Sequence, residues 1–455
     1  MDAGKITESE VVLDDVLERL QQDAKPVLRQ TSNQSFSEFS PDKPLTTVGN
    51  LGLQLIFNSL DSPVARIESK MALIKKLAPG WIKKGGDVAK LQLLMMKVSQ
   101  DGDRHNFVEA EKIVDQILSL LGATNVSTAK ASEDAHREER DVLLADAKKF
   151  NLTGIEDYVG WSVVEPEQGK SKWDLYREDA AAIKGAGYRF VPYLWAQVLP
   201  KWVKSDSKYV LTSNVVTGLE TEDLSIFAPE TLEAYDHFYG EAQREMGDYV
   251  DMVRVGSPYD YGETSYPAAA ANAQFPMKNL EPGFWVNEAP ARAHFKETMK
   301  NKYGTVEQLN AAWGTRFDSF ETIDYPNDNK NPRYWLDFMH WYQDGFTEMM
   351  GKIVTVAQKH FPQTPISFNL GWPYEKVNLG QDISGLVKMA AEKHVYLRTP
   401  TGPMVPFLYT KRVATAVRHY KPAGFSSEPV DGSAPLQADG SRLFQGFDDR
   451  SKLAF

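Results

Sequence analysis

Glu263 is the residue of this chain best suited to chemistry. It lies in a loop, 256–267, that follows a short apolar run and also holds glycines, prolines and three tyrosines. Catalytic acids of parallel α/β barrels stand where a buried strand ends. Aromatic rings beside such a carboxylate suit a sugar better than a phosphate or a metal ion. The loop therefore predicts an acid that acts on carbohydrate.

A second carboxylate, Glu428, stands in similar surroundings at 424–429. Two carboxylates of this kind indicate cleavage of a glycosidic bond, in which one protonates the leaving oxygen and the other acts as nucleophile or base. We expect Glu263 to be the acid, with Asp260 as a rival in the same loop, and Glu428 to be its partner. Carboxyl groups about 5–5.5 Å apart give retention of configuration, whereas about 6.5–9.5 Å gives inversion.

Aromatic, amide and cationic side chains at other strand ends are predicted to hold the sugar. Trp161 would form part of the floor of the site, and Trp195 with Gln197 would supply an aromatic plane and an amide. The other predicted substrate-binding residues are Tyr259, Asp260, Tyr261, Tyr266, Asn369, Trp372 and Arg398. Filling the core is the alternative role for the aromatic residues. Glu165, which precedes a proline, is expected to brace its loop.

Short apolar segments alternate with amphipathic helices from about residue 130 onward. Six segments are expected to be strands: 154–159, 188–195, 250–255, 365–369, 395–398 and 423–425. This alternation predicts an α/β fold with a parallel sheet, a TIM (β/α)8-type barrel at 130–455. The residues after Glu428 are loop-like, and 53–57 is the one candidate for a first strand. The barrel is therefore expected to be incomplete at its C-terminus, or closed in an atypical way.

The N-terminal part is expected to be separate from the barrel. Residues 1–60 are polar and include a linker, whereas 61–125 are expected to form an α-helical hairpin module with apolar residues every three or four positions. Asp87, Asp101 and Asp103 could suggest a calcium loop, but they lack the twelve-residue spacing with a closing glutamate. Helix caps and turns are the favoured roles for these three residues.

The bulk composition excludes several functions. The net charge is −11 without a basic cluster, so neither nucleic acid nor an anionic membrane is an expected partner. The chain has no cysteine, and its 8 histidines are scattered, so no metal site or cofactor is predicted. No apolar run reaches about 18 residues, and no signal peptide is predicted at the start. We expect a periplasmic or secreted location, with a cytoplasmic one as the alternative. The sequence predicts no oligomeric state.

Three segments resemble parts of known glycoside hydrolases. Residues 161–174 resemble the W-x-x-x-E-P-x-x-G signature of many barrel glycosidases, and 284–314 resemble the K-Y-G-T and N-x-A-W-G-T segment of family 42 β-galactosidases. The sequence Gly-Glu-x-x-Tyr-Pro at 262–267 resembles the acid-bearing motif of family 14 β-amylases. Enzymes of clan A, to which family 42 belongs, usually have asparagine before this glutamate, where the present chain has Gly262.

The resemblance implies a barrel glycoside hydrolase of the clan A type that acts on oligo- or polysaccharides with two glutamates. The main hypothesis is a retaining enzyme similar to the β-galactosidases. One alternative is an inverting, β-amylase-like hydrolase of α-glucan. The other is a barrel that binds carbohydrate without cleaving it. In all three cases the expected partner is a carbohydrate.

Overall fold

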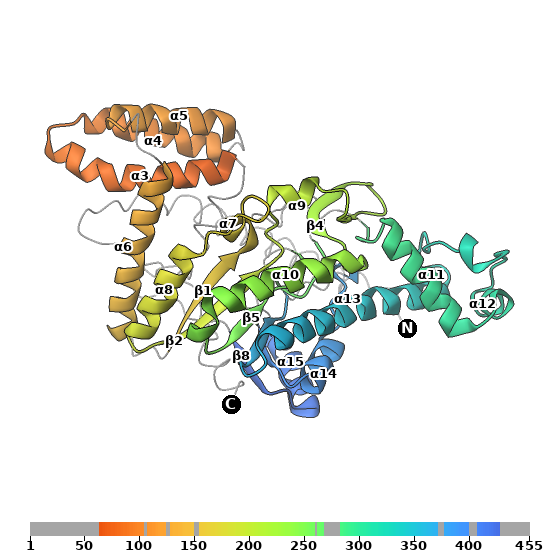
Figure 1. Cartoon of the computed structure of the whole chain (residues 1–455). Coiled ribbons are helices and arrows are strands. Elements are labelled where there is room, and N and C mark those ends of the chain that lie inside the picture. Colours follow the sequence, from red (N-terminus) through yellow and green to blue (C-terminus); the bar gives the residue numbers. More distant parts are fainter. Residues whose placement is uncertain are drawn as a thin grey trace, which may run out of the picture. The chain divides into compact units, whose positions relative to one another are not determined.

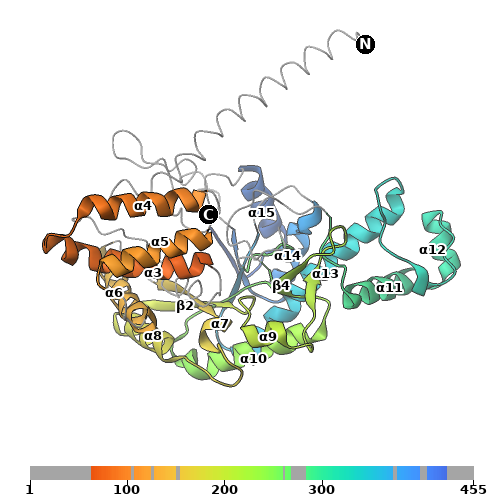
Figure 2. The same cartoon turned by 90° about the horizontal axis from the view of Figure 1, so that it is seen from above.

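Figures 1 and 2 show the computed structural model of the chain, which describes residues 63–103, 107–123, 128–149, 154–259, 262–267, 283–371, 377–399 and 407–427. These residues fall into two compact units, one up to residue 131 and the other from residue 132 onward. The Leu53–Phe57 segment, which was the candidate first strand, lies outside the described residues.

The first unit is built from three helices. They are α3 (Pro63–Lys83), α4 (Val88–Asp103) and α5 (Phe107–Leu120). Their apolar positions form one buried cluster, in which Ile74, Val114 and Ile117 are almost fully covered. Gly85 has a φ of 87°, a conformation that favours glycine, and so allows the turn between α3 and α4. Asp87 caps α4 by accepting a hydrogen bond from the amide of Lys90 at 3.0 Å, as the favoured role predicts.

The second unit contains a parallel sheet of six strands in the order β1-β2-β5-β6-β7-β8. The strands are β1 (Gly154–Gly160), β2 (Arg189–Trp195), β5 (Val253–Val255), β6 (Ile366–Asn369), β7 (Tyr396–Thr399) and β8 (Gly424–Ser427). All six predicted strands are therefore confirmed. Among the described residues, β1 and β8 remain the two edges of the sheet.

Helices cover the outer face of this sheet (Figures 1 and 2). The main ones are α8 (Asp174–Gly185), α10 (Pro229–Met246), α13 (Pro332–His360), α14 (Ile383–Glu392) and α15 (Phe407–Tyr420), and each packs against the next. The strand residues that face them are apolar and fully buried, for example Leu194, Val255 and Phe368. Helix α6 (Thr128–Lys149) is joined to α8 by a buried hydrogen bond of 2.5 Å between His136 and Asp179.

The inner face of the sheet is polar and aromatic. Because side chains alternate along a strand, residues paired in register share a face. Tyr158 pairs with Tyr193, Tyr193 with Arg254, and Asn369 with Arg398, so all of these belong to the inner face. The sheet therefore has an apolar face under its helices and a polar, aromatic face on the other side.

An ion pair shows that the sheet curls. Arg398 on β7 donates to Glu156 on β1 with an Nη1–Oε2 distance of 2.6 Å, although four strand spacings separate these strands. In a flat sheet, four spacings would amount to about 19 Å. The carboxylate of Glu156 also pairs with Arg254 on β5. The sheet therefore bends around its polar face, as the walls of a barrel do.

An excursion of 76 residues, 256–331, separates β5 from α13. It includes α11 (Ala289–Tyr303) and α12 (Val306–Trp313), which lie beside the start of α13 in Figures 1 and 2. Trp313 stacks on Tyr334 with ring centroids 4.0 Å apart and donates to Asp337 at 2.9 Å. The 284–314 segment therefore packs against the start of α13 through Trp313.

Smaller elements lie between the main strands and helices. They are α7 (Trp161–Val164), α9 (Lys201–Ser205), the hairpin of β3 (Leu211–Ser213) and β4 (Glu220–Leu224), and the short helices η1 (Gly247–Tyr249), η2 (Phe320–Thr322) and η3 (Val377–Leu379). In the described part of the chain, no helix is long and apolar enough to span a membrane.

Candidate active site

Glu263 lies in a tight loop beyond the end of β5. The amide of Ser257 donates to the carbonyl of Gly262 at 2.8 Å, and the Ser257 hydroxyl donates to the carbonyl of Glu263 at 2.5 Å. Glu263 itself is 7% exposed. The loop thus folds back on the strand end and keeps the carboxylate largely away from bulk water.

Gly262 is required by the shape of this loop. Its φ is +74°, and a Cβ atom there would lie 2.7 Å from the Tyr193 hydroxyl oxygen and 2.9 Å from both the Gln197 amide nitrogen and the Gly256 Cα. An asparagine, the residue that clan A enzymes usually have before the acid, could not fit. The side chains of Tyr193 and Gln197 occupy the space that it would need.

The acid loop is also fixed to the neighbouring strand β6. The amide of Thr264 donates to the carbonyl of Asn369 at 3.2 Å, and the amide of Gly371 donates to the Thr264 hydroxyl at 3.0 Å. Thr264 and Leu370 form an isolated parallel bridge. Glu263 therefore stands at the C-terminal edge of the sheet, next to the end of β6.

An aromatic wall lines the inner face beside this edge. The rings of Tyr158, Tyr193 and Trp195 lie 4.8 to 5.6 Å apart and form a cluster separate from the main core. The guanidinium of Arg254 lies 4.0 Å from the centroid of the Tyr193 ring, which is cation–π geometry. Trp195, Gln197, Asn369 and Arg398, four of the predicted substrate-binding residues, thus belong to the strand ends around Glu263.

Tyr259 and Tyr266 are fully buried in the main core. The Tyr259 hydroxyl is hydrogen-bonded to that of Thr212 at 3.0 Å, whereas Tyr266 stacks on Tyr342 with ring centroids 3.8 Å apart. Burial raises the pKa of both phenols, so they remain neutral. In this structure the two tyrosines anchor the acid loop to the core, and sugar contact by them stays a prediction.

Trp161 lies on the helical side of the sheet. It is 1% exposed, and its indole N–H donates to Glu165 at 2.9 Å. The Oε1 atom of Glu165 accepts a hydrogen bond from the amide of Gly169 at 2.8 Å. The Oε2 atom, which the Trp161 indole contacts, is also 2.7 Å from Nε2 of His237. Glu165 therefore braces its loop, as the sequence predicts. The role of Trp161 as a sugar-binding floor stays a prediction.

Four predicted site residues, Asp260, Tyr261, Trp372 and Glu428, lie outside the described residues. Within the described ranges, no group of three or more histidine, aspartate or glutamate residues could hold a metal ion.

Glu288 is a buried carboxylate that the sequence pattern did not single out. It is 8% exposed, and burial raises its pKa to about 6. It accepts hydrogen bonds from the amide of Ser213 at 3.1 Å and the hydroxyl of Ser225 at 2.6 Å. A raised pKa is typical of catalytic acids, but both oxygens of Glu288 are engaged in joining α11 to the β3–β4 hairpin. Its position directly before Ala289-Pro290, at a helix start, was the only signal in the sequence.

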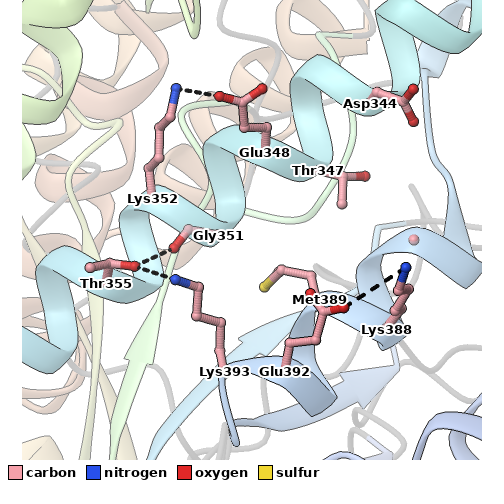
Figure 3. A pocket seen from close by; sticks show the side chains of 11 residues that line it. Asp344, Thr347, Glu348, Gly351, Lys352, Thr355, Lys388, Met389, Glu392 and Lys393 are labelled. Carbon is pink, nitrogen blue, oxygen red and sulfur yellow. Dashed lines mark hydrogen bonds and ion pairs between the residues drawn. The ribbon is translucent and has the colours of Figure 1, made fainter.

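A groove of about 510 Å³ lies in the outer helical layer, between α13 and α14 (Figure 3). Its walls carry charges of both signs, such as Glu348 and Lys352, which are 2.7 Å apart, and Lys393, which donates to Thr355 at 2.8 Å. Its lining residues include no aromatic ring. Because sugar sites typically offer aromatic faces, the strand ends around Glu263 form the better candidate site.

A curled parallel sheet with a carboxylate at the C-terminal end of a central strand is the arrangement of barrel enzymes, and barrel glycoside hydrolases use such carboxylates. The profile of glycosyl hydrolase family 14 matches residues 130–371, more than half of the chain. The chain therefore belongs to glycosyl hydrolase family 14. The predictions of an α/β barrel fold and of a glycoside hydrolase family are confirmed.

The curated relatives include several β-amylases. The β-amylase of Niallia circulans is 27% identical over 272 residues, which cover 53% of this chain and 45% of the relative. A β-galactosidase of Arthrobacter sp is 34% identical over 86 residues, which cover 17% of this chain and 12% of the relative. The chain spans about half the length of the β-amylases it matches, or less. The matches favour the β-amylase-like alternative over the β-galactosidase-like main hypothesis.

Among solved structures, the catalytic domain of β-amylase from Paenibacillus polymyxa matches with a TM-score of 0.54 and 20% identity. The match covers 68% of this chain and 92% of that domain. At this identity the likeness concerns the fold alone.

Proposed function

We propose that this chain cleaves α-glucan in the manner of a β-amylase, with Glu263 as the general acid. The observation that carries the proposal is the position of Glu263. It stands in a Gly-Glu-x-x-Tyr-Pro loop that is hydrogen-bonded to the end of β6, within the region that matches family 14. Family membership supports hydrolysis, and the β-amylase relatives support an α-glucan substrate.

The mechanism follows from the requirements of an oxocarbenium-like transition state. A protonated Glu263 would donate its proton to the leaving oxygen, as the general acid of this reaction must. Glu428 would act as the base that activates a water molecule on the opposite face of the sugar, which inverts the anomeric configuration. Gln197, Asn369 and Arg398 would hydrogen-bond the sugar hydroxyls at the strand ends.

Aromatic stacking would supply most of the apolar contact with the sugar. Trp195 and Trp372 are the predicted platforms, and Tyr158 adds a partly exposed ring that contacts Trp195. Arg398 is held by Glu156, so its guanidinium is fixed before the sugar arrives. A group that is already in place loses little freedom on binding.

The test is hydrolysis of soluble starch, followed by proton NMR of the first products. We expect release of β-maltose by the wild-type chain, and a loss of about 10²–10⁴-fold in kcat for Glu263→Gln. Glu392→Gln, an exposed glutamate of α14, is the matched control and should retain full activity. Starch binding without turnover would contradict the proposal and support a non-catalytic barrel.

The second candidate is a β-galactosidase-like activity. It is favoured by the 284–314 segment and by the short match to the Arthrobacter enzyme. Hydrolysis of an aryl β-galactoside, with no release of maltose from starch, would select it over the first proposal.

A further inference from the structure

The hydroxyl of Tyr409, on α15, reaches the end of β6 beside the acid loop. It donates to the carbonyl of Gly371 at 2.8 Å, and Gly371 in turn donates its amide to the hydroxyl of Thr264. Tyr409 is 5% exposed. A buried tyrosine from the last described helix is thus linked through a single residue to the neighbour of Glu263.

Gln381, in the connection before α14, joins the same residues from another side. Its side-chain amide donates to the carbonyl of Thr264 at 3.1 Å and to the carbonyl of Gly371 at 3.2 Å. It is also hydrogen-bonded to the Tyr409 side chain. Two residues that are far apart in the sequence therefore converge on one short stretch of backbone.

Tyr409 also lies within electrostatic reach of the acid itself. Burial raises the pKa of the Tyr409 phenol, and the negative charge of Glu263 adds to this rise. Tyr409 is consequently a neutral hydroxyl donor at every pH at which the chain would act.

We propose that Tyr409 and Gln381 are positioning residues that hold Glu263 in place for proton transfer, through Thr264 and Gly371. This inference rests on the proposed function. A catalytic acid displaced by about 1 Å can lose about 10²-fold in rate, so the hydrogen bonds that fix its loop matter as much as the acid. Neither residue needs to touch the sugar for this role.

The experiment compares Tyr409→Phe with Tyr420→Phe, both on α15. Each variant loses one hydroxyl, but the Tyr420 hydroxyl contacts Ser384 at 3.2 Å on the exposed side of the helix. For Tyr409→Phe we expect kcat on starch to fall about 10–100-fold, with KM changed less than about 2-fold. Tyr420→Phe should behave as the wild type. Gln381→Met, which keeps the length of the side chain and removes its amide, should resemble Tyr409→Phe.

The pH profile distinguishes positioning from a general loss of structure. Activity should fall on the basic side of the profile as the acid loses its proton. If Tyr409→Phe admits water to the acid, this basic limb should move to lower pH, because hydration favours the charged carboxylate. A smaller folded fraction would lower the rate at every pH equally, and thermal unfolding of each variant measures that fraction.

The outcomes separate the two proposals. If the wild-type chain hydrolyses starch and both tyrosine variants match it in kcat and pH profile, the positioning role is wrong while the proposed function stands. A lower rate in Tyr409→Phe that is fully accounted for by a smaller folded fraction would also overturn the positioning role. If the folded wild-type chain does not hydrolyse starch, the proposed function fails first.

Discussion

The amide of Thr264 donates to the carbonyl of Asn369 at 3.2 Å, which places the residue after Glu263 in register with the end of β6. The acid loop therefore extends the parallel pairing of β5 and β6 by one isolated bridge, between Thr264 and Leu370. The acid thus takes its position from two strands rather than from a loop alone, and strands hold a site more precisely than loops do. The residues around it can be tested one at a time.

Gly262 should tolerate no side chain. Gly262→Ala would place a methyl group against Tyr193, Gln197 and the backbone of Gly256, and it should lower the free energy of unfolding by about 2–4 kcal/mol. Gly314 also has a positive φ, of 65°, but has open space around it. Gly314→Ala therefore reports the backbone strain alone and should cost about 1–2 kcal/mol. Urea unfolding measures the loss of stability in each variant. Equal losses in Gly262→Ala and Gly314→Ala would show that the neighbours of Gly262 do not crowd an added methyl group.

Glu288 should make stability depend on pH. Because its pKa rises from 4.5 to about 6 on folding, the folded state binds a proton more tightly than the unfolded state. The contribution of Glu288 to the free energy of unfolding, up to about 2 kcal/mol in total, is fully present below pH about 4.5. It is lost as the pH rises through about 6. Urea unfolding between pH 4.5 and 7.5 should show this slope in the wild type. Glu288→Gln should lack it, whereas the exposed Glu392→Gln should keep it.

Arg398 should stabilise the curled sheet through Glu156. Arg398→Met removes an arginine that pairs with this carboxylate beside Arg254. Because both side chains of the Arg398–Glu156 pair are only partly buried, we expect a loss of about 1–3 kcal/mol in the free energy of unfolding. Arg418→Met, an exposed arginine on α15, should cost less than about 0.5 kcal/mol. Equal effects of the two variants would show that the pair contributes nothing.

The apolar runs predicted the strands well because the outer face of each strand is buried under helices. At β2 and β6 even short runs such as Phe190–Leu194 and Ile366–Asn369 were sufficient. The β3–β4 hairpin was missed, because polar residues dominate both strands, as in Glu220–Leu224. Its pairing depends on contacts with α11 and Tyr259 rather than on its own sequence pattern.

The candidate site was predictable in its residue types and less so in its contacts. A loop rich in tyrosine does not reveal which rings turn inward, and Tyr259 and Tyr266 both pack into the core. Gln381 and Tyr409 do not lie in a recognisable sequence motif. Their roles depend on contacts with Thr264 and Gly371, residues that are distant in the sequence and that only the fold brings close. The requirement for glycine at position 262 likewise could not be predicted, because it depends on the space that the Gln197 side chain fills.

The most direct test of Glu263 as the general acid compares two substrates of the Glu263→Gln variant. Starch has a leaving group that must be protonated, whereas the fluoride of α-maltosyl fluoride leaves with little help from an acid. We predict that the variant loses about 10²–10⁴-fold in kcat on starch but less than about 10-fold on α-maltosyl fluoride. An equal loss on both substrates, or no loss on starch, would contradict the assignment of Glu263.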